Sequence, residues 1–167
     1  MRVSITDLLK LPIIALVCPV VPAMASDECT FSEVGILENI KRIASTHSGA
    51  TVESERLRAS WELDAETVEY FEAGGCYDYG EKAGRATQLA KAHDVDTVLR
   101  VAIDLAQKFM TEQDRKLVIK AIENGAFETF ASDETVTRTI GHPFGEIVIS
   151  HSFAEGTDTV EIAWPVY

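Results

Sequence analysis

Cys76 combines intrinsic reactivity with a suggestive setting, the stretch AGGCYDYG at residues 73–80. A cysteine becomes a nucleophile when a neighbouring base lowers the pKa of its thiol, and histidine is the usual base. The two preceding glycines could offer backbone amides to an oxyanion. However, no C-x-x-C pair and no hydrolase signature surrounds the cysteine. A structural disulfide is therefore the competing role.

The first 25 residues bear on this choice because they resemble an export signal. Arg2 and Lys10 give a basic start, an apolar run interrupted by prolines follows, and the AMA stretch at 23–25 has the small residues that a signal peptidase recognises. We therefore predict a signal peptide over residues 1–25 and a mature domain over 26–167. The expected location is the periplasm, with export to the medium as the second possibility.

Cleavage would remove Cys18 and leave two cysteines, Cys29 and Cys76. An even number of cysteines in an oxidising compartment indicates one disulfide. Such a bridge would close a loop of about 50 residues and stabilise the fold by about 4 kcal/mol in the chain-entropy model. We expect it to hold the N-terminal segment against the domain, which leaves Cys76 unreactive.

The histidines and carboxylates show no spacing typical of a metal or catalytic site. The four histidines are scattered, without H-x-x-x-H, and neither a metal nor a cofactor is expected. His151 falls in the inward register of an alternating segment, which predicts a buried, hydrogen-bonded side chain. His142 precedes Pro143 in a turn and is expected to be exposed. These two histidines, His142 and His151, are the ones to inspect if the protein is an enzyme.

Acidic pairs are common in the chain and do not by themselves indicate a glycosidase, whose carboxylates meet only in three dimensions. Four glutamates are expected to concentrate negative charge on the first predicted hairpin, namely Glu53, Glu55, Glu69 and Glu72.

The loop after Cys76 suits protein recognition. Tyr77 and Tyr79 would supply contact area at a low entropy cost, while Asp78 and Glu81 would attract a basic partner. A disulfide at Cys76 would hold this loop still. The alternative is that the tyrosines pack over the disulfide and cover it.

The overall charge narrows the choice of partner. The chain has 27 acidic and 15 basic residues and a formal net charge of −12. Such a surface repels nucleic-acid phosphates and anionic lipids, so neither nucleic acid nor, after signal cleavage, membrane is expected as a partner. A basic protein fits, although acidity that simply keeps the protein soluble is an equal alternative. An open sheet edge would also allow a homodimer.

The first half of the mature chain predicts a helix followed by a hairpin. Apolar residues at helical spacing predict an amphipathic helix over 31–46, and alternation predicts strands over 57–63 and 67–73. The alanines and lysines of 81–93 favour a short helix, weakened by Gly84.

The second half predicts two helices and then strands. Helices from Asp94 or Asp96 to 110, and from Thr111 to Asn124, would form a helical hairpin. Alternation predicts a short strand over 135–140 and a final hairpin of 147–153 with 160–166. The pattern indicates one α+β domain: an antiparallel sheet of two hairpins plus a short strand, with the N-terminal helix and the helical hairpin on one face.

Compartment, charge and the lack of a catalytic motif favour a non-enzymatic binding protein. We expect an inhibitor or immunity-type protein that neutralises a cationic enzyme acting on the cell wall by occluding it. Two alternatives stay open: a small exported hydrolase with a dispersed His/carboxylate site, and a carrier of a small ligand between helices and sheet.

Overall fold

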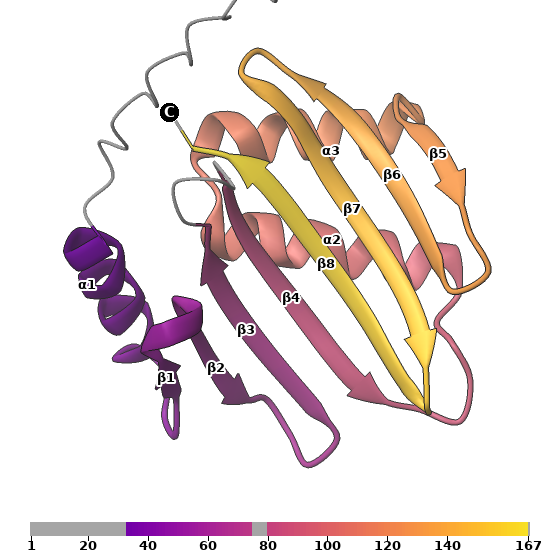
Figure 1. Ribbon diagram of the computed structural model, residues 1–167. Coiled ribbons are helices and arrows are strands. Elements are labelled where there is room, and N and C mark those ends of the chain that lie inside the picture. Colours follow the sequence, from indigo (N-terminus) through magenta and orange to yellow (C-terminus); the bar gives the residue numbers. More distant parts are fainter. Residues whose placement is uncertain (1–32, 75–79, 167) are drawn as a thin grey trace, which may run out of the picture.

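The computed structural model describes residues 33–74 and 80–166, which form an α+β structure (Figure 1). Three α-helices and eight strands lie in these ranges. In chain order, the elements are α1 (Glu33–Ala44), β1 (Thr51–Glu53), the short 3-10 helix η1 (Ser54–Arg56), β2 (Arg58–Glu62), β3 (Thr67–Ala73), β4 (Gly80–Gln88), α2 (Val95–Phe109), α3 (Glu112–Asn124), β5 (Glu128–Ala131), β6 (Thr135–His142), β7 (Gly145–Ala154) and β8 (Thr157–Pro165).

The eight strands form one open antiparallel sheet with the order β1-β2-β3-β4-β8-β7-β6-β5. This order consists of two four-stranded meanders, β1–β4 and β5–β8. Each meander runs from an edge of the sheet to its centre, where β4 pairs with β8. A helix precedes each meander, α1 before β1 and α3 before β5. The fold therefore contains a topological repeat, although the sequence shows none.

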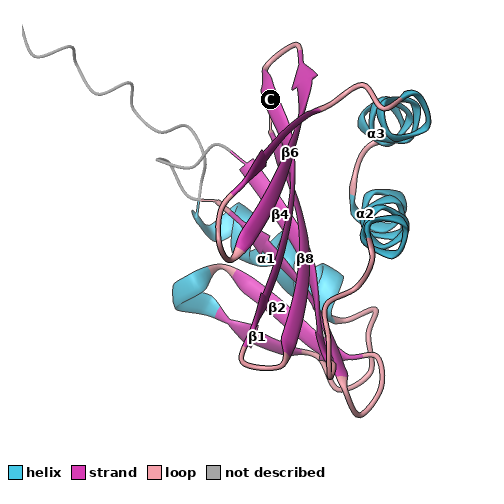
Figure 2. Ribbon diagram, turned by 90° about the vertical axis from the view of Figure 1, so that its right-hand side faces the viewer, coloured by secondary structure: helices cyan, strands magenta, loops and turns pink. Residues whose placement is uncertain are grey.

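One face of the sheet carries the hydrophobic core and the helices. In Figure 2, α2 and α3 lie side by side on one side of the sheet. The residues that alternate toward them in the central strands are buried, as in β8, where Val160, Ile162 and Trp164 belong to the core. Ile40 of α1 joins the same core, and His47 after α1 stacks on Trp61 of β2 at 3.8 Å. We refer to this side as the covered face and to the other as the open face.

Capping fixes where the two central helices begin and end, and confirms the predicted helical hairpin. The Asp94 side chain accepts a hydrogen bond from the backbone N–H of Thr97 at 2.8 Å, so α2 begins at the next residue. Thr111 caps α3 in the same way through the backbone N–H of Asp114. Gly125 ends α3 with a φ of 62°, a left-handed conformation that glycine adopts without strain.

The prediction of a helix over 81–93 was wrong, because residues 80–88 form the central strand β4. Its alanines, lysine and glutamine favour a helix in isolation, but tertiary packing overrides this propensity. The small side chain of Ala83 is completely buried at the covered face. Gly84 lies on the open face, where the Tyr70 ring packs against it. A central position between β3 and β8 therefore selects small residues here rather than the residues usual in strands.

The other strands match the prediction apart from two that it lacks. The strands predicted over 57–63, 67–73, 135–140, 147–153 and 160–166 correspond to β2, β3, β6, β7 and β8. The edge strands β1 and β5 have only three and four residues, too few for an alternating pattern to be recognised. The sheet consequently has eight strands instead of the predicted five.

The contact between Gly84 and Tyr70 leads to a first prediction. A Cβ atom at position 84 would overlap the Tyr70 ring, so Gly84→Ala must displace a buried side chain. We expect the free energy of unfolding in urea to fall by about 2 kcal/mol. Gly141→Ala is the matched control on the open face of β6, where an added Cβ would meet nothing within 4 Å. Equal stability of the two variants would contradict this account of β4.

Candidate binding face

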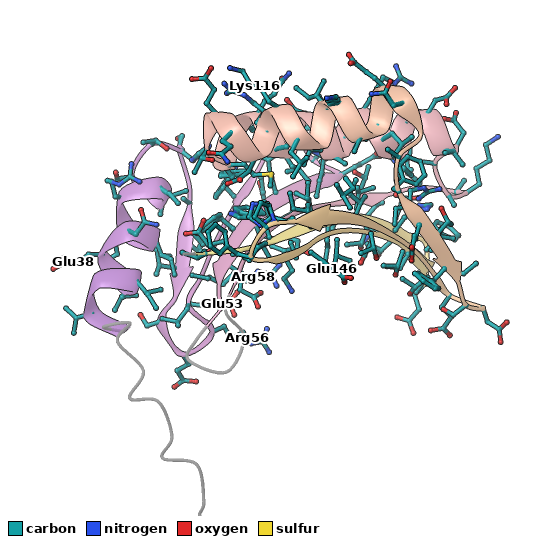
Figure 3. The ribbon with its side chains drawn as sticks, turned by 90° about the horizontal axis from the view of Figure 1, so that it is seen from above. Glu38, Glu53, Arg56, Arg58, Lys116 and Glu146 are labelled. Carbon is teal, nitrogen blue, oxygen red and sulfur yellow. The ribbon has the colours of Figure 1, made fainter. Side chains whose placement is uncertain are left out.

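The open face is defined by the strand registers as the residues that alternate away from the helices. Arg58 of β2 pairs with Glu72 of β3, and Glu72 pairs with Lys82 of β4, so all three point to this side. Figure 3 shows Arg58, Glu53 and Glu146 on the side of the sheet opposite α2 and α3. Because neither α2 nor α3 packs on it, this face offers a partner an uncovered sheet surface.

A cluster of charged side chains around Tyr70 occupies the half of the open face formed by β2, β3, β4 and β8. The guanidinium carbon of Arg58 lies 3.8 Å from the centre of the Tyr70 ring, and the Tyr70 hydroxyl donates a hydrogen bond to Glu161. Lys82 Nζ lies 3.4 Å from Glu161 and 3.6 Å from Glu72. We call these five residues the Tyr70 cluster. Each of its two cations has a carboxylate or an aromatic ring beside it.

The environment keeps Tyr70 protonated, so that it can donate this hydrogen bond. Desolvation is the main cause that raises the pKa of the Tyr70 hydroxyl well above its ordinary value, and the hydrogen bond to Glu161 adds to it. The cluster is thus a fixed arrangement of paired charges. It gives the centre of the sheet a rigid polar surface rather than a nucleophile.

The other half of the open face is lined by hydroxyl groups. The stretches TVTRT in β6, SHS in β7 and TDT in β8 each place alternate Thr or Ser residues on this side. Thr157 accepts a hydrogen bond from the Gln88 side chain at 2.8 Å. Six other hydroxyl groups on this half make no side-chain hydrogen bond within the described ranges. The strand register places them in rows across β6, β7 and β8: Thr135, Thr137, Thr139, Ser150, Ser152 and Thr159.

Charge is distributed unevenly between the helices and the rest of the fold. Each of α1, α2 and α3 carries as many acidic as basic residues, so its net charge is zero. The strands and connections of the described ranges hold sixteen acidic residues and six basic ones, a net charge of −10. Three exposed glutamates that pair with no cation of the described residues lie on the open face near strand ends: Glu62, Glu128 and Glu146.

The covered face contains an ionic network around a buried glutamate, which the sequence did not indicate. Glu69 of β3 is 0% exposed, and its carboxylate contacts Arg85 of β4 at 2.5 Å and Lys108 of α2 at 3.1 Å. Asp104 of α2 pairs with both cations. The expectation that Glu69 adds to a surface charge was therefore wrong. The network instead links α2 to the two strands beneath it.

A second buried carboxylate, Asp158, joins two histidines. Asp158 of β8 has a 0% exposed side chain, and Nε2 of His151 lies 2.9 Å from it. His93, in the connection before α2, contributes its backbone N–H at 2.8 Å and Nδ1 at 3.0 Å. Burial raises the pKa of the Asp158 carboxyl, but these hydrogen bonds outweigh burial and hold the pKa below its usual range. Asp158 thus ties the start of α2 to the sheet.

The structure separates the two histidines singled out from the sequence. His151 lies on the covered face, partly buried and hydrogen-bonded to Asp158, as predicted. The expectation that His142 is exposed was wrong, because its side chain is only 2% exposed and Nε2 lies 3.1 Å from Asp114 at the start of α3. The β6–β7 turn directs His142 under α3 instead of into solvent. Each histidine therefore has a separate carboxylate partner.

Most residues of the predicted recognition loop lie outside the described ranges. The loop residues Tyr77, Asp78 and Tyr79 lie there, and so do both proposed disulfide partners, Cys29 and Cys76. Glu81 is described, and its register partner in β8 is Trp164 on the covered face. Burial raises the pKa of the Glu81 carboxyl, opposed by a hydrogen bond with Trp164. The disulfide and the recognition loop remain predictions.

Across residues 33–74 and 80–166, no three His, Cys, Asp or Glu side chains converge as metal ligands do. None of the helices in those ranges combines the length and the apolar character needed to cross a bilayer.

Comparison with known proteins identifies no relative. No protein-family model, no curated protein and no solved structure matches the chain.

The interactions of Asp158 lead to a second prediction. Asp158→Asn should lower the free energy of unfolding at pH 7 by about 2 kcal/mol, because the amide cannot accept all the hydrogen bonds that the carboxylate accepts. The carboxylate stabilises the fold above its unfolded pKa of about 3.9, and this contribution is lost as the pH falls through the lower folded pKa. The stabilities of the two proteins should therefore converge in strongly acidic solution.

Asp94→Asn is the control, since asparagine caps a helix as well as aspartate does. Urea unfolding between pH 2 and pH 8 measures both variants. A constant difference between wild type and Asp158→Asn over this range would show that charge at Asp158 does not stabilise the fold.

Proposed function

We propose that this protein is an exported binding protein that holds a basic partner on the open face of its sheet. The observation that carries the proposal is the separation of charge: the helices are neutral, whereas the strands and connections contain the whole acidic excess of the described ranges. Such a distribution attracts a cationic protein toward the sheet rather than toward the helices. The proposed partner is a cell-wall-acting enzyme, and the predicted export signal supports this choice.

The composition of the open face is also suited to occlusion of another protein. Its central charges are paired within the Tyr70 cluster, so a partner need not displace them. The neighbouring hydroxyl groups can donate and accept hydrogen bonds without a large desolvation cost. The free carboxylates of Glu62, Glu128 and Glu146 lie near the ends of strands, where rim charges typically accelerate association. A rigid sheet loses little conformational entropy on binding.

The buried positions of the histidines weigh against the alternative of a hydrolase. A general base must reach its substrate, directly or through one water molecule. His142 is almost entirely buried beneath α3, and His151 is only 13% exposed. Their hydrogen bonds to Asp114 and Asp158 connect elements of the fold, which is sufficient to explain their presence.

A hollow of about 340 Å³ lies between the ends of α1 and α2, and it bears on the alternative of a ligand carrier. Its lining mixes basic and polar side chains with apolar ones: Arg42, Ile43, Thr46, His47, Lys108 and Phe109. A carrier of an apolar ligand would instead need a closed, mainly apolar cavity. The open face therefore remains the better-supported binding surface.

A charge-reversal experiment tests the proposal. Glu62→Lys combined with Glu146→Lys should weaken binding to a basic peptidoglycan-cleaving enzyme by at least about tenfold, because two rim carboxylates become cations. Glu38→Lys combined with Glu123→Lys changes the net charge equally, but on the exposed surfaces of α1 and α3. Calorimetry at two salt concentrations and inhibition of wall digestion measure the effect.

The proposal requires that the sheet variant lose binding while the helix variant keeps most of it. An equal loss in both would indicate attraction by net charge alone. The absence of any bound or inhibited enzyme across a panel of basic wall hydrolases would contradict the proposal. Sedimentation of the protein alone separately tests the predicted possibility of a homodimer.

A further inference from the structure

Arg138 of β6 is a buried cation for which residues 33–74 and 80–166 provide no partner. It is 6% exposed and lies on the covered face, in register with Ile149 of β7 and Thr129 of β5. Within these ranges, its guanidinium forms no ion pair and no hydrogen bond. Its Nη1 atom is shut off from solvent and unpaired. By contrast, Arg85 on the same face contacts both Glu69 and Asp104.

An unpaired guanidinium in this position is energetically unfavourable. Arginine stays charged at all ordinary pH values, so Arg138 cannot relieve the cost of burial by losing a proton. An apolar side chain of similar length would fill the same space without that cost. The chain is rich in carboxylates, with 27 acidic residues, yet none of those described is placed here. A bound anion would supply the missing partner.

The end of the helix layer leaves access to this site. All four residues of β5 are exposed, including Thr129 and Ala131, which alternate toward the covered side. The helices therefore do not extend over β5, and Arg138 lies at the border of the strip they leave uncovered. Of the three guanidinium nitrogens of Arg138, only Nη1 is both inaccessible to solvent and without a hydrogen-bond partner. Solvent therefore reaches the edge formed by Nε and Nη2. That edge is the geometry with which arginine binds two oxygens of one anion.

We propose that Arg138 and the hydroxyl of Thr129 form a binding site for a small oxyanion, a carboxylate or a phosphate. Directly paired residues of neighbouring strands have their Cβ atoms about 5 Å apart, which lets both side chains reach one anion. The guanidinium would bind two oxygens, and the threonine hydroxyl would donate to an oxygen of the same anion. The site lies on the opposite side of the sheet from the proposed partner face and is independent of it.

Anion-dependent stability of the full chain tests the site. Sodium phosphate and sodium acetate are titrated separately at constant ionic strength, with sodium chloride as the reference salt, and unfolding is followed in urea. Above the dissociation constant, each tenfold rise in the concentration of the free anion should raise the folded-to-unfolded ratio about tenfold. The anion whose stabilising effect begins at the lower concentration is the preferred ligand, phosphate or carboxylate. Because the protein is strongly acidic, non-specific binding of anions should be weak.

Substitutions assign the effect to Arg138. Arg138→Met should be at least as stable as wild type in chloride and should lose the response to phosphate and acetate. Arg100→Met is the matched control, because Arg100 is an exposed arginine of α2 that bonds only to its own helix, and this variant should keep the response. Phosphate titration of the wild type, followed by the Nε–Hε NMR signal of Arg138, gives a readout that does not need a folded variant.

The proposal fails if neither anion stabilises the wild type more than chloride does. It also fails if Arg138→Met keeps the full response, or if the Arg138 Nε–Hε signal does not shift when anions stabilise the protein. Loss of folding in Arg138→Met together with an unshifted wild-type signal would identify Arg138 as purely structural.

Discussion

The pairing of β4 with β8 is the interaction on which the rest of the sheet depends. Each four-stranded meander forms from neighbouring segments of the chain, but only this ladder, nine residue pairs long, joins the two into one sheet. It also places Ala83, Ile162 and Trp164 side by side beneath the helices, so that α2 can pack across both halves. The Tyr70 cluster crosses the same junction, because Tyr70 and Lys82 belong to the first meander and Glu161 to the second.

The sequence predicted the parts of the fold that depend on local patterns. The two central helices have clear caps at Asp94, Thr111 and Gly125, and five strands show alternation. Strand β4 was missed because its small residues are required by neighbours that are distant in the sequence. Ala83 lies beneath the helices, and Gly84 lies beneath the Tyr70 ring. A pattern read along the chain contains no information about which ring will pack on Gly84 from another strand.

The candidate binding face could not be predicted from the sequence for a similar reason. The acidic excess is evident from composition, but its absence from the helices becomes meaningful only when the helices are seen to cover one face. Glu69 and Glu72, three residues apart, point to opposite sides of β3, one into an ionic network and one into the open face. Glutamates that the sequence grouped on one hairpin are divided between the two faces by the register of the strands.

The position of β8 at the end of the described chain sets an order of events in time. During synthesis from the N-terminus, the first meander and both central helices emerge before the strand that must lie beside β4. Until residues 157–165 arrive, β4 has an open edge and the core beneath α2 lacks Val160, Ile162 and Trp164. The two halves of the sheet can therefore join only after β8 has emerged, so a molecule truncated before residue 157 exposes the unpaired edge of β4 and is prone to aggregation.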